Sequence, residues 1–158
     1  MVFTMKIDKF EDGYAAFSNF LLHPVILDGV VYPSNEHAYH AAKTLDKALR
    51  RTVVFQTKIV NGEKVEVVTT PGQCKRIGRK LPLRPDWEQV KLQVMEDLVR
   101  QKFQDPDLKE ILLDTGKDEL IEGNWWGDTF WGVCNGVGEN HLGKILMKVR
   151  EELQNEGK

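Results

Sequence analysis

The stretch from Glu36 to Lys43 combines a carboxylate, a phenol, an imidazole and an amine, side chains that can stabilise a charge or take up a proton. On a helix of about 3.6 residues per turn, four polar side chains share one face: Glu36, Tyr39, His40 and Lys43. The opposite face is apolar and carries Ala38, Ala41, Ala42 and Leu45. Glu36 falls in the first turn, where the helix dipole favours an anion, so its carboxylate can stabilise a cation or take a proton from water. A solvated helix face has the same pattern, and both interpretations stay open here.

Two histidines on this stretch, His37 and His40, raise the question of a metal site. No third His or Cys stands at ligand-like spacing nearby, and the His-Glu-x-x-His pattern is absent. The sequence therefore predicts no metal site, and we expect no cofactor.

A second group of candidate residues lies in a loop rich in glycine and tryptophan. Residues 124–132 place three tryptophans and one phenylalanine around Asp128. Aromatic rings around an acid suit a flat ring bound by stacking, although a buried aromatic cluster is the alternative. The Gly136–Gly138 turn then leads into a helix, as phosphate sites often do. Residues 138–144 match Gly-x-x-x-x-Gly-Lys, but Ile145 replaces the Ser or Thr that binds magnesium, which excludes a P-loop NTPase.

Basic residues gather in one ten-residue stretch that contains no acid: Lys75, Arg76, Arg79, Lys80 and Arg84. A solvated helix face and a local phosphate site are both consistent with this cluster. The net charge of −2 indicates that the protein as a whole is not a basic nucleic-acid binder.

The elements that must position these residues are mostly helices. Helices are expected from Ser34 to about Asp46, from Thr70-Pro71 through the basic cluster, from Pro85, from Asp105-Pro106 to near Gly116, and from near Asn140. Residues 25–32 predict a hairpin that turns at Asp28-Gly29, and residues 52–69 predict a longer one that turns at Asn61-Gly62. Residues 123–140 show no periodicity, and a long irregular segment in a compact domain usually serves a function.

The whole chain, residues 1–158, is expected to form a single α+β domain that is mainly helical. No apolar run approaches the ~18–20 residues of a membrane span, and we expect no contact with a membrane. The first residues lack the features of a secretory signal, and the two cysteines are isolated, so a cytoplasmic location is expected.

With these residues in view, the chain resembles the NADAR family, also called YbiA-like N-glycosidases, from Phe17 to Leu153. The segments that carry the resemblance are Phe17-Ser-Asn-Phe20, Tyr32-Pro-Ser-Asn-Glu-His-Ala-Tyr39 continuing to Lys43, Lys75-Arg-Ile-Gly-Arg79, Arg84-Pro-Asp-Trp87-Glu88, Leu112-Leu-Asp-Thr-Gly116, Trp126-Gly-Asp128-Thr-Phe-Trp131-Gly132 and Gly138-Glu-Asn-His-Leu-Gly143. Each segment alone is weak, but their order and spacing together are specific.

The resemblance implies hydrolysis of a bond between ribose and a base nitrogen. One branch of the family acts on early riboflavin-pathway intermediates, in which a ribose phosphate carries an amino-pyrimidine. Another branch removes ADP-ribose from guanine in DNA, which makes DNA a possible substrate carrier. The resemblance implies a mainly helical α+β fold and a site built from Asn19, Glu36, Lys43, Trp87, Asp128 and Trp131. The hairpin at 52–69 departs from the family pattern as an expected insertion, which leaves the choice of substrate open.

These residues suggest distinct roles in the cleavage of a glycosidic bond, a reaction that builds positive charge on the sugar. Glu36 is expected to face the sugar carbon, Asp128 to donate a proton to the base or hold it, and Lys43 to bind an anion or act as a nucleophile. Further substrate contacts are expected from Tyr39, Arg79, Arg84, Trp87, Trp131, Gly138 and Asn140. The alternative function is a module that binds ADP-ribose or a nucleotide without cleaving it. The sequence does not indicate an oligomeric state.

Overall fold

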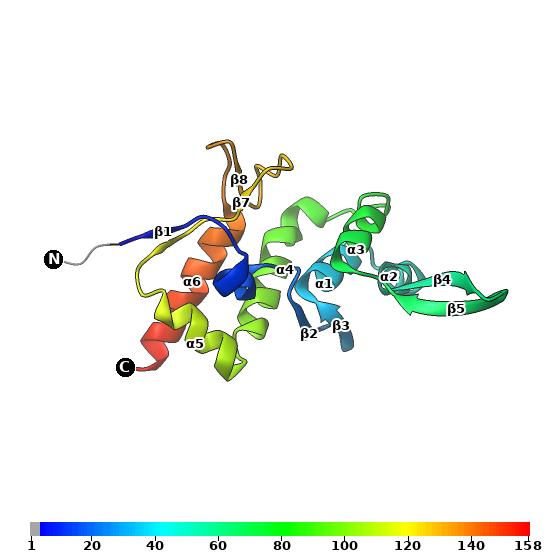
Figure 1. Ribbon diagram of the computed structural model, residues 1–158, viewed down its shortest axis with the longest axis horizontal. Coiled ribbons are helices and arrows are strands. Elements are labelled where there is room, and N and C mark those ends of the chain that lie inside the picture. The colour runs from blue at the N-terminus through cyan, green and yellow to red at the C-terminus, as the bar shows by residue number, and fades with distance from the viewer. Residues whose placement is uncertain (1–3) are drawn as a thin grey trace. The chain divides into compact units, whose positions relative to one another are not determined.

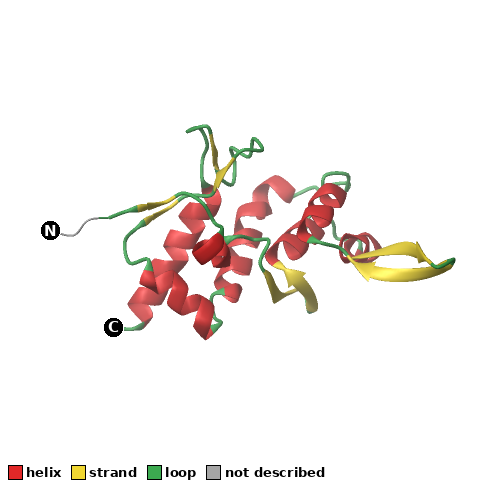
Figure 2. Cartoon of the chain, in the orientation of Figure 1, coloured by secondary structure: helices red, strands yellow, loops and turns green. Residues whose placement is uncertain are grey.

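The computed structural model describes residues 4–158, which fold as two compact units. The first comprises residues 4–21 and 99–158, and the second comprises residues 22–98. The division falls within one helix, α4 (Trp87–Lys102). Both units mix helices with short strand pairs, as Figures 1 and 2 show, and this confirms the predicted α+β class.

The second unit is built around α1 (Asn35–Ala41). Before it stands a hairpin of β2 (Leu22–Leu27) and β3 (Val30–Ser34), which turns at Asp28-Gly29 as predicted. The helices α2 (Lys47–Val54) and α3 (Pro71–Gly78) pack against α1. Strands β4 (Phe55–Val60) and β5 (Glu63–Val68) form an antiparallel hairpin between these two helices in the sequence, with the predicted turn at Asn61-Gly62 (Figure 1).

Two boundaries in this unit were predicted wrongly. The first helix ends at Ala41, and Leu45 is exposed rather than part of a buried apolar face. Residues 52–54 belong to α2 and not to the hairpin, because Asp46 caps a new helix by accepting a hydrogen bond from the Leu49 amide at 3.1 Å. Val53 and Val54, although β-branched, are buried within the unit as part of that helix.

The first unit contains the C-terminal end of α4, α5 (Pro106–Asp114) and α6 (His141–Glu156). Near the start of the chain lies a 3₁₀ helix, η1 (Asp12–Phe17), whose Phe17 ring packs 6.2 Å from that of Phe103. Short parallel pairs join β1 (Lys6–Ile7) to β6 (Glu119–Leu120) and β7 (Gly123–Asn124) to β8 (Val133–Cys134). The remainder of residues 123–140 is largely irregular, as predicted.

Each unit has its own apolar core. In the second unit the buried side chains include Val25, Tyr32, Ala38, Ala41, Val53 and Cys74. In the first they include Phe17, Phe103, Leu112, Leu120, Leu146 and Val149. Within residues 4–158, no helix has the length and apolar character that crossing a membrane requires.

Candidate active site

The helix α1 is fixed at its first turn by His37. The Ser34 hydroxyl oxygen accepts a hydrogen bond from the His37 amide at 3.2 Å and lies 2.7 Å from His37 Nδ1. On the other side of the ring, Nε2 lies 2.8 Å from the carbonyl oxygen of Thr69, which only a protonated nitrogen can bind. His37 is therefore a structural residue that ties α1 to the end of the β4–β5 hairpin. Burial lowers the pKa of His37, which favours this neutral ring.

Glu36 and His40, one turn apart on α1, form a buried pair. The distance between His40 Nε2 and Glu36 Oε1 is 2.8 Å, and the two residues expose 4% and 8% of their surface. Because a carboxylate oxygen only accepts, Nε2 carries the proton of this bond. Burial lowers the pKa of His40, although the hydrogen bond to Glu36 opposes that shift. The imidazole is thus held neutral, and it orients a carboxylate that has little contact with solvent.

The neighbouring turn of α3 holds this pair in place from the outside. Gly78, the last residue of α3, lies so close to His40 that a Cβ built there would stand 2.2 Å from Nδ1. That distance is far below van der Waals contact, so only glycine fits without displacing the imidazole. Among the residues that the structure describes, Nδ1 has no hydrogen-bond partner.

Lys43 follows α1 and brings an amine to the same region. Its Nζ donates to the carbonyl oxygen of Gly78 at 3.4 Å and stands 5.6 Å from the centre of the Tyr39 ring. Burial is the main cause that lowers the pKa of Lys43, and the positive charge of Arg79 lowers it further, whereas Glu36 raises it. The amine is therefore a partly desolvated donor that lies near both the Glu36 carboxylate and the Arg79 guanidinium, and it can bind an anionic group.

Aromatic and basic side chains complete this part of the site. The Tyr39 ring lies 5.2 Å from the ring of Trp87, and both residues are buried. The backbone amide of Arg84 donates a hydrogen bond to the carbonyl oxygen of Lys43 at 2.6 Å. Its guanidinium donates two hydrogen bonds to Asp86, at 2.6 and 3.0 Å. Phosphate binding by Arg84 would therefore compete with an existing ion pair.

The predicted site residues of the first unit lie in a loop organised by Asp128. Its Oδ1 accepts hydrogen bonds from the amides of Phe130 and Trp131, at 3.1 and 2.9 Å. The side chain of Asn124 binds the backbone of the same residue. Asn124 Oδ1 accepts a hydrogen bond from the Asp128 amide at 3.0 Å, and Asn124 Nδ2 donates one to the Asp128 carbonyl oxygen at 2.8 Å. Asp128 thus acts as a hydrogen-bond acceptor within its own loop.

The loop aromatics differ in their surroundings. The ring of Trp131 lies 4.8 Å from that of Phe130, which in turn lies 4.5 Å from His141. Trp125 is 86% exposed and makes an edge contact with Trp126. The loop therefore has one packed group of rings and one exposed pair.

Two other predicted contacts support the loop backbone. Gly138 adopts φ +154°, and a Cβ there would lie 2.1 Å from the carbonyl oxygen of Gly132. Asn140 uses both ends of its amide, because Nδ2 donates to the carbonyl oxygen of Leu120 and Oδ1 accepts from the Glu122 amide, each at 2.9 Å. Asn140 is itself buried, and both ends of its amide hold the loop backbone.

Asn19 is buried and lies in a turn that sequence reasoning did not connect to any other element. The carbonyl oxygen of the preceding residue, Ser18, accepts a hydrogen bond from Lys102 Nζ at 2.8 Å. Lys102 is almost fully buried, and burial lowers its pKa to about 7. A lysine near the end of an amphipathic helix gives no sequence signal for such a contact.

Sequence reasoning placed His40 on the same helix face as Glu36 but assigned it no role, and it missed the contact of Gly78 with His40. The spacing of His40, four residues after Glu36, was a usable signal, because residues i and i+4 are neighbours on a helix. Gly78 offered none, because the close approach arises from packing between α1 and α3. Among residues 4–158, no group of three His, Cys, Asp or Glu residues is arranged to hold a metal ion.

The arrangement can be compared with known proteins. The model of the NADAR domain matches residues 5–154 of the chain. The N-glycosidase YbiA of Shigella flexneri serotype 5b (strain 8401) is 39% identical over 147 residues, which cover 90% of this chain and 84% of that protein. The NMR structure of the Escherichia coli protein YbiA is similar with a TM-score of 0.78 and 36% sequence identity, over 99% of this chain and 89% of that chain.

A longer relative has a different name. The riboflavin biosynthesis protein VVA0006 of Vibrio vulnificus (strain YJ016) is 36% identical over 148 residues, which cover 91% of this chain but 37% of that protein. The same type of domain therefore occurs as one part of a larger chain.

Proposed function

The chain belongs to the NADAR domain family, and we propose that it is a hydrolase that cleaves the bond between ribose and a nitrogen of a base. The observation that carries the proposal is the buried Glu36 carboxylate, which a neutral His40 holds in one orientation beside the amine of Lys43. Relatives called N-glycosidases, 37–39% identical over most of the chain, support the same reaction class.

The reaction requires stabilisation of positive charge on the sugar. As the ribosyl–nitrogen bond breaks, its electron pair goes to the base nitrogen, which gains a proton, and the ribose ring approaches an oxocarbenium ion. Water then bonds to the ribose carbon through oxygen and loses a proton. An ionised carboxylate with low solvent exposure stabilises this cation more strongly than one in water. We assign that role to Glu36.

Lys43 is proposed to bind an anionic group of the substrate rather than to attack the sugar. Its amine contacts Gly78 and the Tyr39 ring, and Arg79 adds positive potential close by. A phosphate on the ribose would be attracted to this region. The lowered pKa also makes a covalent route chemically accessible, so the two routes need a direct test.

For the first unit the proposed roles concern the base. Trp131 offers a ring for stacking, and the Asp128 carboxylate offers an acceptor for amino groups of a base. Replacement of Asp128 by Asn keeps the oxygen that binds the two loop amides, so a loss of turnover with an unchanged melting temperature would support a direct role.

The proposed substrate is a phosphorylated ribose that carries an amino-pyrimidine, as in early riboflavin-pathway intermediates. The similarity to a riboflavin biosynthesis protein supports this choice. A second candidate is ADP-ribose on guanine in DNA, and the observation that favours it is a groove with three basic side chains, Lys58, Arg76 and Lys80. Both substrates fit a cytoplasmic enzyme, which the two free cysteines also favour.

The rival function is a module that binds a nucleotide without cleaving it. A binder has no need of a buried carboxylate beside an amine. We would incubate the protein with ribosylamino-pyrimidine phosphate and with DNA that carries ADP-ribosyl guanine, and identify the products by mass spectrometry. We expect free base and ribose phosphate from the first, or ADP-ribose from the second. Binding of both without any product would support the rival function.

A further inference from the structure

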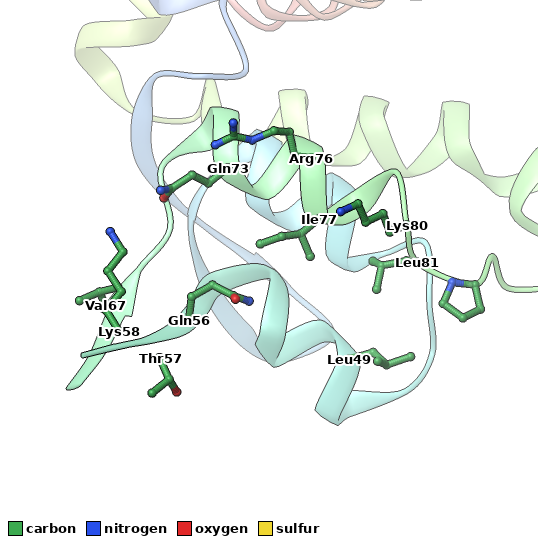
Figure 3. Close-up of a pocket in the computed structure, with 11 residues that line it drawn as sticks. Leu49, Gln56, Thr57, Lys58, Val67, Gln73, Arg76, Ile77, Lys80 and Leu81 are labelled. Atoms are coloured by element: carbon green, nitrogen blue, oxygen red, sulfur yellow. The ribbon is translucent and has the colours of Figure 1, made fainter. Parts of the chain in front are cut away.

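A groove of about 610 Å³ lies between the β4–β5 hairpin and α3, entirely within the second unit (Figure 3). One wall is formed by hairpin residues that include Gln56 and Lys58, and the other by Arg76 and Lys80 from the end of α3 and the turn after it. Apolar side chains, among them Ile77 and Leu81, lie between these walls. None of the residues that line the groove is acidic.

The hairpin register places Lys58 and Gln56, which both line the groove, on the same face of the ribbon. Gln56 stands opposite Val67, and Lys58 stands opposite Val65, so these side chains share one face of the ribbon. Glu66 stands opposite Thr57 and therefore belongs to the other face. There its two oxygens accept hydrogen bonds from Arg51, at 2.6 and 2.9 Å.

The three cations of the groove, Lys58, Arg76 and Lys80, lack internal counterions. Within the described part of the chain, residues 4–158, none of them forms an ion pair or a side-chain hydrogen bond. Glu63, the acid nearest along the hairpin, lies at its tip opposite Val60 and does not line the groove. The dipole of α3 stabilises a basic residue at the C-terminal end of the helix. Lys58 lies on a strand, where no helix dipole stabilises its charge.

The helix α3 and the turn after it carry two pairs of basic residues with different neighbours. Lys75 and Arg79, four residues apart, act on Lys43, whose pKa their charges lower. Arg76 and Lys80, also four residues apart, line the groove. The helix α3 therefore lines the groove and also packs against α1, which carries Glu36. The groove and α1 belong to the same unit.

We infer that this groove binds the phosphodiester backbone of a nucleic-acid strand. Uncompensated cations on two walls attract a ligand with repeated negative charges, since each phosphate that they neutralise releases counterions. The apolar strip between the walls can take the faces of bases without sequence preference. The choice of a nucleic acid over an acidic peptide rests on the second candidate substrate of the proposed function, ADP-ribose on guanine in DNA, because a nucleic acid carries that base.

The test is binding of an unmodified, fluorescein-labelled twelve-nucleotide oligo-dT, followed by fluorescence anisotropy at several salt concentrations. The groove variant carries Lys58→Gln, Arg76→Gln and Lys80→Gln. The matched control carries Lys64→Gln, Lys117→Gln and Lys144→Gln, which remove the same charge from exposed residues outside the groove. Duplex DNA, oligo-U and poly-glutamate serve as competitors.

We expect the groove variant to bind oligo-dT at least ~10-fold more weakly than the control variant. The slope of log K against log salt should fall in magnitude by about 2, since each lost contact to a single strand contributes roughly 0.7. Equal affinity of the two variants would overturn the inference, as would displacement of oligo-dT by poly-glutamate but not by unlabelled strand. Displacement by duplex DNA or oligo-U identifies which strand form is preferred and supports it.

The outcome is separable from that of the proposed function. The oligonucleotide carries no ribosylated base, so its binding does not depend on turnover. Hydrolysis of ribosylamino-pyrimidine phosphate by the groove variant should equal that of the control variant, because the three cations do not contact Glu36 or Lys43. An inactive protein that still binds oligo-dT through the groove would contradict the proposed function and leave this inference standing.

Discussion

Substitution of Gly78 by Ala tests whether the packing of α3 on α1 orients the buried pair of Glu36 and His40. The added Cβ would stand 2.2 Å from Nδ1 and 2.6 Å from Cγ of His40, so the ring must move. Within residues 4–158, the imidazole forms no hydrogen bond other than the one to Glu36, at 2.8 Å, and packing provides the remaining contacts. A displaced ring would leave the carboxylate without the donor that orients it.

The size of the effect follows from three terms. Overpacking of a core usually costs ~1–3 kcal/mol. Loss of a hydrogen bond to a charged group adds ~1.5–3 kcal/mol if the ring leaves Glu36 completely. The better helix propensity of alanine returns at most ~1 kcal/mol. If the ring leaves Glu36 completely, we expect a net loss of about 1.5–5 kcal/mol, which corresponds to roughly 3–20 °C in melting temperature for a chain of this size.

The same helix supplies a matched control in Gly72. A Cβ at Gly72 meets nothing within 4 Å, and no positive φ is found there, so Gly72→Ala should be neutral or stabilise by ~0.4–1 kcal/mol. Thermal melts and initial rates of product formation would be measured for both variants. If Gly78→Ala melts at or above the temperature of Gly72→Ala and turns over normally, the proposed packing of His40 is refuted.

Three further outcomes are expected. Burial lowers the pKa of His37 and His40 from 6.5, so below that pH the folded protein binds fewer protons than the unfolded chain. The free energy of unfolding should therefore fall as the pH drops below about 6.5. The loss is up to ~1.4 kcal/mol per pH unit for each histidine. Urea titrations at pH 7.5 and 5.5 check this, and His40→Gln should reduce the loss. Replacement of residues 57–66 by Asn-Gly, which joins Gln56 to Val67 in register, should leave a single cooperative melt, because Ile59 and Val60 are 72% and 48% exposed; aggregation would show that the hairpin belongs to the core. Borohydride added during turnover should leave no adduct on Lys43, and Lys43→Arg should retain much of the activity; an adduct found by peptide mass spectrometry would establish the covalent route.

Local signals in the sequence predicted much of the fold. The turns at Asp28-Gly29 and Asn61-Gly62 and the start of α3 at Pro71 depend on residues a few positions apart. The helix α2 was missed because Thr52, Val53 and Val54, at its C-terminal end, favour a strand by propensity. Packing in the core of the second unit outweighs that preference, which is worth only about 1 kcal/mol.

For the candidate site, the sequence identified the residues of α1 but not what holds them. Periodicity placed Glu36 and Lys43 on one face, yet the whole of α1 is buried, so the expected contrast between a buried and a solvated face is absent. The contacts of His40 with Gly78 and of Lys102 with Ser18 join segments distant in sequence. No pattern within one element encodes such contacts.

The substitution Glu36→Gln tests the central claim most directly. The amide oxygen of Gln can still accept the hydrogen bond from His40 Nε2, so the melting temperature and the affinity for substrate should be retained. The charge that stabilises the sugar cation is lost, and release of free base should slow by ~10²-fold or more. Rates of base release from ribosylamino-pyrimidine phosphate, measured beside the melting temperature, decide the matter. A rate close to that of the unaltered protein would remove Glu36 from the mechanism and contradict the account.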